Sequence, residues 1–272
     1  MNAKSRQTET MLWSMMILYI IVFGLVTSFR HYNFETQTWD MGVFVQTYWN
    51  TIEGRIMANN LEEAPNHFGV HMSPWMFLLV PGYALFESPY YLLIVQTIAL
   101  ALGALPLYLL AEQVLKNKKL ALIIATGYLL YPALHWINTF DFHAVSFLVP
   151  LLLAACYFLE KRRFWWMTLF LIGAASTRED AIIVVLFFGI FALLRSQKQR
   201  ATSKETKIFL AIILIAAIYF LLTIKILMPA FGGGLLRFDR YQELGSSASE
   251  ILKNIILHPT LLINTVFTLP KI

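Results

Sequence analysis

The chain has 272 residues, of which 58% are hydrophobic and 14% are charged. Soluble domains carry about 25% charged residues, so this composition excludes an ordinary soluble protein and indicates a chain that crosses a membrane several times. The formal net charge of +5 comes largely from basic residues between apolar runs, a pattern that indicates membrane topology rather than nucleic acid binding.

The first predicted span covers residues 11–29, an uncharged run long enough to cross the ~30 Å hydrocarbon core. A long connection follows at residues 30–87, which we expect to form the first extracytoplasmic loop. Within it, residues 72–86 are apolar but too short to cross, and Pro81 and Gly82 interrupt them. They predict an interfacial or partly sunken helix.

Three further spans are predicted at residues 90–114, 120–137 and 145–159. Pro106 lies inside the first of these and predicts a kink, because proline cannot donate a backbone hydrogen bond within a helix. Short polar turns separate the three spans, so successive spans are expected to run in opposite directions.

Two shorter apolar runs, residues 164–177 and 181–194, are separated only by Arg178, Glu179 and Asp180. Each run predicts a helix of roughly 21 Å, which is shorter than the ~30 Å hydrocarbon core. The three charged residues are therefore expected below the outer surface, in a cavity lined by protein or water, because isolated charges at that depth are costly.

A seventh span is predicted at residues 208–228, with Lys225 near its outer end. Residues 229–258 follow as the second major extracytoplasmic segment, which is rich in glycine and polar residues. The predicted fold class is therefore an all-α polytopic membrane protein with about seven transmembrane helices, forming a single transmembrane domain over residues 1–272.

The basic residues set the expected orientation. They cluster at the N-terminus and at residues 116–119, 161–163 and 195–207, which are alternate connections between the predicted spans. By the positive-inside rule these connections face the cytosol. The sequence thus predicts a plasma-membrane protein with a cytosolic N-terminus and with its two long polar segments on the extracytoplasmic side.

Three groups of polar residues are expected to come together on that side if the spans pack as a bundle. They are Asp40 with Asn66, His67 and His71; Asp141 with His143; and Arg178 with Glu179 and Asp180. Carboxylates in partly apolar surroundings can act as bases or share a divalent metal with a histidine. A divalent metal on Asp40, Asp141 and His143 is accordingly a candidate cofactor.

The first group also has a structural interpretation. Asp40 precedes a helical pattern, and aspartate is a good N-cap residue, so capping is an alternative role. His67 and His71 would share one helix face only if HFGVH is helical, and a lone histidine pair of this kind is more often structural than metal-binding.

The other two groups have structural interpretations as well. Asp141 and His143 flank Phe142, and one of the two could face a cavity. Arg178 could form an internal ion pair with Glu179 or Asp180 that stabilises the hairpin.

The cations on the outward side near the later spans are Arg178, Lys225, Arg237 and Arg240. Any of them could hold an anionic head group, and arginine is suited to bidentate contact with phosphate. For Lys225 the ordinary interpretation is a side chain that reaches along the span to the membrane interface.

Five segments carry a resemblance to a known family: WDMGVFVQTYWNTIEGR, NHFGVHMSPWMFLLVP, ALPLYLLAEQVL, LLYPALHWINTFDFHAVSFLVPLLL and STREDA. From about residue 33 onward the chain resembles an uncharacterised family of predicted membrane proteins, domain of unknown function 2079. That family in turn is similar to the GT-C glycosyltransferases, which include protein mannosyltransferases, oligosaccharyltransferases and aminoarabinose transferases. The resemblance implies transfer of a sugar from a polyprenyl-phosphate carrier to a glycan, lipid or protein acceptor on the outer membrane face.

The resemblance also implies roles for particular residues. Asp40 corresponds to the first-loop catalytic carboxylate that activates or orients the acceptor, and Asp141 to a second-loop acid that helps bind a metal or the acceptor. His71, together with Ser73 and Pro74, matches the entry to the loop helix of several relatives. The substrate-binding set predicted on this basis is His67, His71, His143, Arg178, Glu179, Asp180, Lys225, Arg237 and Arg240, with Arg178 near the lipid phosphate.

Relatives generally continue with further spans, so the transmembrane domain is expected to be incomplete at its C-terminus. Two other functions stay open at this point. One is a transporter or flippase-like protein for a lipid or small solute, whose path the charges of residues 178–180 would line, although we see no inverted repeat. The other is a non-catalytic membrane subunit.

Overall fold

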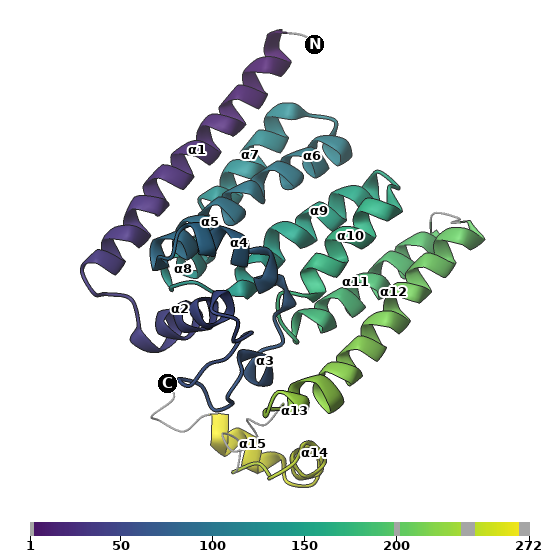
Figure 1. Cartoon of the computed structure of the whole chain (residues 1–272). Helices are drawn as coiled ribbons and strands as arrows, with labels where there is room; N and C mark the ends of the chain where they lie inside the picture. The colour runs from purple at the N-terminus through teal and green to yellow at the C-terminus, as the bar shows by residue number, and fades with distance from the viewer. Residues whose placement is uncertain (1–2, 199–201, 235–242, 267–272) are drawn as a thin grey trace.

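The computed structural model of the protein describes residues 3–198, 202–234 and 243–266. Regular structure in these ranges is helical, and no β-strand occurs within them, so the predicted all-α class is confirmed. Figure 1 shows α1 (Ala3–Tyr32) along one edge and α12 (Ser203–Leu222) along the opposite edge, with the other long helices between them.

Three helical stretches are long and apolar enough to cross a membrane: Arg6–Tyr32, Pro89–Leu115 and Ser203–Ala230. A fourth is reached if α7 (Lys118–Leu129) and α8 (Pro132–Thr139), which meet at a 42° bend, form one broken span. The remaining apolar helices are shorter: α9 (Leu148–Glu160), α10 (Phe164–Ala175) and α11 (Ala181–Lys198). The membrane character of the chain is therefore supported, whereas the predicted number of seven spans is not confirmed.

Prolines explain where two of the predicted spans are interrupted. The second predicted span has a break at Gly103, between α5 (Pro89–Leu102) and α6 (Ala104–Leu115), because Pro106 cannot donate a hydrogen bond to the carbonyl one turn earlier. Both helices together still form one stretch that is long enough to cross a membrane, so the predicted kink stays a prediction. The third was predicted as continuous, and this is wrong. Tyr131 is extended (φ −71°, ψ 121°), since the residue before a proline avoids the helical region, and α8 starts anew at Pro132.

The hairpin of α10 and α11 is less regular than predicted. Instead of two helices of equal length, α10 has 12 residues and α11 has 18. Arg178, Glu179 and Asp180 form the turn between them, as the sequence predicts. At 1.5 Å per residue α10 is only about 18 Å long, well short of the hydrocarbon core of a bilayer.

The loop before α5 folds into a layer of short helices at one end of the bundle (Figure 1). These are α2 (Thr38–Ile52), α3 (His67–Val70), η1 (Pro74–Leu78) and α4 (Val80–Leu85). The single interfacial helix predicted at residues 72–86 is thus two short helices that meet at Leu79. Buried aromatic and methionine side chains hold this layer to the bundle: Phe44, Tyr48, Met57, Met76, Tyr83 and Phe142.

The basic connections lie together at another end of the bundle. Lys118 at the start of α7 pairs with Glu9 of α1 at 3.0 Å, and Lys161 after α9 donates to Gln113 of α6 at 2.9 Å. Arg162 pairs with Glu205, at the start of α12, which links the α9–α10 turn to the α11–α12 connection. We call this region the basic end; it is remote from α2 and α3 (Figure 1).

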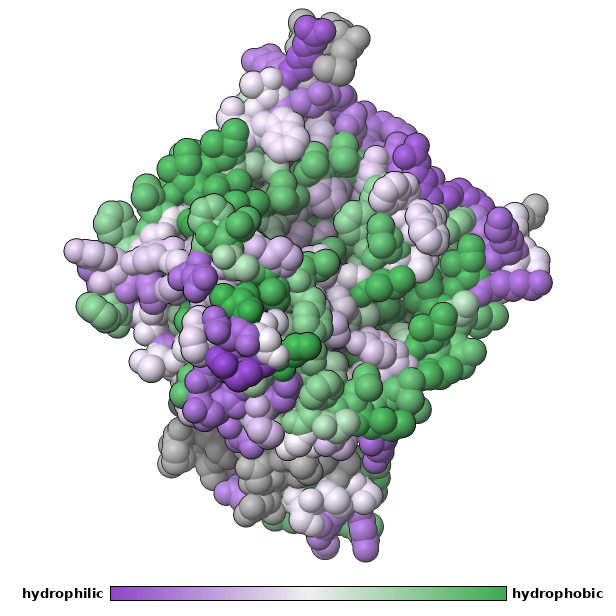
Figure 2. All heavy atoms as spheres, viewed as in Figure 1, coloured by the Kyte–Doolittle hydropathy of each residue, from purple (hydrophilic) through white to green (hydrophobic). Residues whose placement is uncertain are grey.

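The outer faces of the bundle suit a lipid environment. Large apolar side chains are exposed on the outer helices, among them Ile17, Leu18, Phe29, Trp165, Leu214 and Ile215. Figure 2 shows hydrophobic surface over much of both flanks of the molecule. A soluble protein rarely exposes apolar patches of this extent, which agrees with the membrane prediction.

After α12 the helix continues through a π-helical turn, η3 (Thr223–Leu227), and α13 (Met228–Ala230). The chain then returns to the loop layer, where the N–H of Gly234 donates to the carbonyl of Gly69 at 3.0 Å. Two more helices, α14 (Ala248–Leu257) and α15 (Pro259–Val266), follow.

Candidate active site

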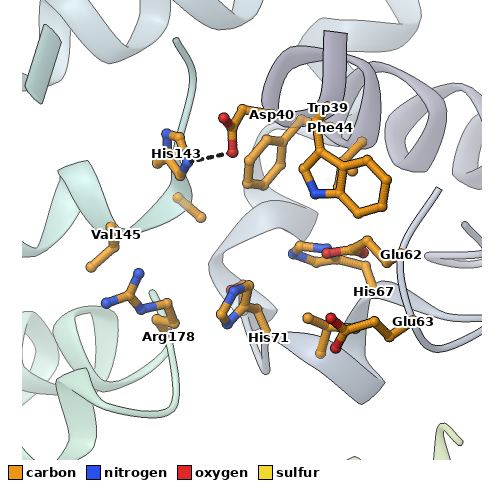
Figure 3. Close-up of a pocket in the computed structure, with 14 residues that line it drawn as sticks. Trp39, Asp40, Phe44, Glu62, Glu63, His67, His71, His143, Val145 and Arg178 are labelled. Carbon is orange, nitrogen blue, oxygen red and sulfur yellow. Dashed lines mark hydrogen bonds and ion pairs between the residues drawn. The ribbon is translucent and has the colours of Figure 1, made fainter. Parts of the chain in front are cut away.

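A pocket of about 320 Å³ opens where the loop layer meets the α10–α11 turn. Its lining comes from α2, from the chain around α3, from the start of η2 (Ala144–Phe147) and from that turn. The lining residues are Trp39, Asp40, Val43, Phe44, Glu62, Glu63, His67, Val70, His71, Ser73, His143, Ala144, Val145 and Arg178. Three segments far apart in the sequence therefore contribute charged side chains to one cavity (Figure 3).

Asp40 lies in the first turn of α2 and faces the pocket. The N-cap of α2 is Gln37, and no side chain caps it, so the alternative that Asp40 serves as the N-cap is wrong. Its Oδ1 lies 3.7 Å from Nε2 of His143, and both side chains are about one quarter exposed, at 27% and 26%. The carboxylate thus keeps contact with the cavity while the positive end of the α2 dipole favours its charge.

Asp141 and His143 have different surroundings on the two sides of the buried Phe142, and the segment is not extended, because Asp141 has a left-handed backbone conformation (φ 63°). Asp141 is buried and its Oδ2 accepts a hydrogen bond of 2.8 Å from the N–H of Gln37. It does not line the pocket. Burial raises the pKa of Asp141, although the hydrogen bond from Gln37 opposes the rise. Of the two residues, His143 is the one that reaches the cavity.

His143 is held in place through its backbone. Gln96 of α5 accepts from the N–H of His143 at 2.8 Å and donates to the carbonyl of Asp141 at 2.8 Å. Burial lowers the pKa of His143, and the opposing charge of Asp40 does not reverse this. The imidazole is therefore neutral near pH 7 and can exchange a proton with its surroundings. Gln96 carries no motif, and sequence reasoning missed it.

His67 forms a second acid–histidine pair on the opposite wall. Its Nδ1 lies 2.8 Å from Oε2 of Glu62, and the two side chains are 1% and 7% exposed. Since an ionised carboxylate only accepts, Nδ1 carries the proton and Nε2 is left as an acceptor. Nε2 is buried with no hydrogen-bond partner among the described residues, and the His67 side chain belongs to the pocket lining (Figure 3).

His71 connects the loop layer to the α10–α11 turn. Its Nδ1 lies 3.0 Å from Oε1 of Glu179, while Oε2 of the same carboxylate accepts from the N–H of Met72 at 3.1 Å. A backbone bond of 2.9 Å from the N–H of Trp75 to the carbonyl of Ser176 joins the same two segments. Glu179 therefore lies outside the pocket lining and positions His71 within it. Asn66 is also structural, because it caps α3.

Arg178 is the cation of the pocket. Its Nε donates to Oδ1 of Asp180 at 2.7 Å, and Nη2 bonds to the other carboxylate oxygen. Burial acts to raise the pKa of Asp180, but the bond and charge of Arg178 outweigh it and lower that pKa. This ion pair agrees with the structural interpretation of the turn. It also fixes the guanidinium plane of Arg178, which lines the pocket (Figure 3), and it uses only two of the five N–H donors.

The other predicted residues do not join the pocket. Lys225 lies in η3 on an exposed face and does not line the cavity, which fits its interfacial interpretation. Arg237 and Arg240 lie outside the described residues. Within the described ranges no three His, Cys, Asp or Glu side chains converge to hold a metal ion, so the predicted set of Asp40, Asp141 and His143 is not assembled.

Sequence reasoning missed part of the lining. Trp39, Glu62 and Glu63 belong to the pocket, although they were not among the predicted site residues. The sequence did contain a signal for the contact between Glu62 and His67. Glu62 precedes His67 by five residues, and a tight loop over residues 62–67 can bring the carboxylate back to the imidazole.

An apolar groove of about 310 Å³ lies beside the turn, between α10, α11 and α12. Pro74 and Ser176 line it; they adjoin Ser73 and the Arg178 turn, which belong to the pocket region. Farther along, its walls are formed by apolar residues such as Leu171, Val185 and Ile215. A polar pocket and an apolar groove thus meet at the α10–α11 turn.

Comparison with known proteins gives one assignment. The profile of a family described as "Predicted membrane protein (DUF2079)" matches residues 30–272. No curated protein and no solved structure matches the chain significantly. Since the matched residues include the whole pocket and most of the bundle, the chain belongs to this DUF2079 family of predicted membrane proteins.

Proposed function

We propose that the protein is a membrane-embedded glycosyltransferase that uses a polyprenyl-phosphate-linked sugar on the extracytoplasmic face. The observation that carries the proposal is that Asp40, His143 and Arg178 face one pocket, and that an apolar groove lies beside the same α10–α11 turn. A base, a cation and a place for a lipid chain are the three things that such a transfer requires.

The reaction is a displacement at the anomeric carbon of the donor sugar. The acceptor hydroxyl oxygen forms the new bond, its proton passes to the Asp40 carboxylate, and the bond from the anomeric carbon to the phosphate oxygen breaks with its electron pair on the phosphate. Attack from the face opposite the leaving group inverts the configuration. The neighbouring imidazole, 3.7 Å from Asp40, can then pass the proton to solvent.

The leaving lipid phosphate is assigned to Arg178. Two of its five N–H groups bond to Asp180, and the others stay available for phosphate oxygens. Because the ion pair with Asp180 already orients the guanidinium plane, little side-chain entropy is lost when the phosphate binds. A cation at this position stabilises the charge that develops on the leaving group.

The acceptor is assigned to the opposite wall of the pocket. The free Nε2 of His67 can accept a hydrogen bond from a hydroxyl group, and Glu62 fixes its tautomer. Trp39, which is 60% exposed at the rim, offers a flat apolar face of the kind on which a sugar ring can rest. The donor lipid chain would lie in the groove between α10, α11 and α12.

The side of the membrane on which the pocket lies is assigned from the distribution of basic residues. The basic end gathers Lys118, Lys161 and Arg162. The elements that line the pocket include α2 and α3, and these helices lie away from the basic end (Figure 1). If the basic end faces the cytosol by the positive-inside rule, the pocket faces outward. This orientation would give the site access to acceptors of the cell envelope.

The test is mass spectrometry of lipids that co-purify with the protein from its own membrane, followed by an assay of polyprenyl-phosphate release. We expect a polyprenyl phosphate or its glycosylated form, depleted in an Arg178→Ala variant, with Lys225→Ala as the matched control cation outside the pocket. A preparation that retains phospholipid but no polyprenyl phosphate, and that releases none from an added donor pool, would overturn the proposal.

A further inference from the structure

A second polar cavity, of about 370 Å³, lies at the basic end between the α6–α7 turn and the end of α9. Its polar lining consists of Glu112, Gln113, Lys116, Lys118, Lys161 and the ring of Tyr157. Three cations thus face one anion in this cavity. The proposed transferase site uses none of these residues.

Two of the three lysines carry charge that no acid offsets. Lys118 is paired with Glu9 at 3.0 Å and with Glu112 at 3.4 Å. Lys161, in contrast, donates to the neutral amide of Gln113 and stands 5.9 Å from the centre of the Tyr157 ring. Neither Lys116 nor Lys161 forms an ion pair with any described residue. The cavity is therefore suited to an anion.

An apolar groove of about 560 Å³ continues from this cavity and shares Leu109 and Tyr157 with it. One wall is a face of α5 and α6 that includes Val95, Leu102 and Leu109, and the other is a face of α9 that includes Pro150, Ala154 and Tyr157. The wall from Val95 to Leu109 extends about 21 Å at the helical rise per residue. Figure 2 shows a hollow between these two groups of helices.

From this continuity we propose that the basic end binds one anionic phospholipid, with its phosphate between Lys116 and Lys161 and an acyl chain in the groove. The lysine-lined cavity would receive the phosphate of the lipid, and the apolar groove that continues from it would receive the acyl chain. Lysine clusters at the membrane surface attract anionic lipids, and the groove adds burial of apolar area. No lining residue is shared with the Asp40 pocket or with the groove beside it.

The test is native mass spectrometry of the full chain in detergent, titrated with phosphatidylglycerol or with phosphatidylcholine of the same acyl chains. We expect one phosphatidylglycerol to bind about 25-fold more tightly than phosphatidylcholine, because each of the two lysines near an anionic head group contributes roughly a factor of five. The double variant Lys116→Ala/Lys161→Ala should lose most of that preference. A wild-type protein that binds both lipids equally would overturn the proposal.

Two controls separate this site from general attraction by positive charge. The double variant Lys119→Ala/Lys207→Ala removes two exposed lysines that lie outside the cavity and should keep the preference. Filling the groove with Ala99→Trp should weaken binding of both lipids, since Ala99 lines its wall. Equal losses in the two lysine variants, or free glycerol phosphate binding as well as the lipid, would also overturn the proposal. The proposed lipid site shares no residue with the proposed transferase site. An assay of polyprenyl-phosphate release therefore tests the transferase proposal separately from the lipid-binding proposal.

Discussion

The carboxylate of Glu179 contacts two neighbouring residues of the loop layer. Its Oε1 lies 3.0 Å from Nδ1 of His71, and its Oε2 accepts a hydrogen bond of 3.1 Å from the backbone N–H of Met72. The glutamate comes from the α10–α11 turn and the histidine from the loop layer, 108 residues earlier in the chain. The side chain of Glu179 is only 12% exposed, so the contact is shielded from water. It holds two walls of the pocket at a fixed separation.

Removing this carboxylate should destabilise the protein. Glu179→Ala leaves the N–H of Met72 without its acceptor in a partly buried setting, which costs about 1–3 kcal/mol of unfolding free energy. Thermal unfolding in detergent measures the loss. Glu87→Ala, at an exposed acid in the loop before α5, is the control. An unchanged melting temperature in Glu179→Ala would show that the contact does not hold the two segments together.

The proposed base can be tested by an isosteric change. Asp40→Asn keeps the shape of the side chain but removes its basicity, so sugar transfer should fall by about 100-fold or more. The rate of polyprenyl-phosphate release measures this. Glu53→Gln, at the exposed C-cap of the same helix, should leave the rate unchanged. Normal transfer by a well-folded Asp40→Asn protein would remove Asp40 from the catalytic role.

His143 should make stability fall in mild acid. Burial lowers its pKa below the ordinary value of 6.5, so between these two values the unfolded chain binds a proton that the folded chain does not. Stability therefore decreases as the pH falls through about 6.5 toward the lowered pKa. Asp141, with its raised pKa, has the opposite effect nearer to its own ordinary value of 3.8.

The measurement is the melting temperature between about pH 7.5 and pH 5.5, the range in which histidine titrates. His143→Gln should flatten the dependence on pH. The control is His258→Gln, at an exposed histidine between α14 and α15, and it should keep the wild-type slope. The same slope in all three proteins would contradict the assignment to His143.

A close approach of two backbones makes Gly233 sensitive to substitution. A Cβ atom at this position would lie 1.9 Å from the carbonyl oxygen of Gly69, and neither backbone can move without disturbing the bond from Gly234 to Gly69. Gly233→Ala should cost about 1–3 kcal/mol of stability. Gly127→Ala is the matched control, because nothing lies within 4 Å of its added Cβ. Equal melting temperatures for the two variants would contradict the close approach.

Much of the fold was predictable because hydropathy and proline act locally. The position of α1 along the chain, the break near Pro106 and the turn at residues 178–180 all follow from short stretches of sequence. The break at Pro132 was also signalled by a proline, but hydropathy alone suggested an uninterrupted span. The unequal lengths of α10 and α11 could not be predicted, since the extension of α11 to Lys198 runs through polar residues.

The site was predictable in part of its membership but not in its geometry. Asp40, His67, His71, His143 and Arg178 were all expected on one side, and the structure brings them to one pocket. Apart from the pair of Arg178 with Asp180, the contacts that position the site were not foreseen. The bond of Gln37 to Asp141 and the contacts of Gln96 depend on how α5 packs against distant segments, and a single sequence does not encode such pairings in any local pattern.

The shortness of α10 has a consequence for the membrane around it. A helix of 12 residues is about 18 Å long, against a hydrocarbon core of ~30 Å, so this flank of the protein imposes a hydrophobic mismatch on the lipids that touch it. If α10 crosses the bilayer as the sequence predicts, the lipids around it must thin locally, which brings the charged turn at residues 178–180 nearer to the level of the head groups. The energy of inserting this flank therefore depends on bilayer thickness, and thinner membranes suit the protein better than thicker ones.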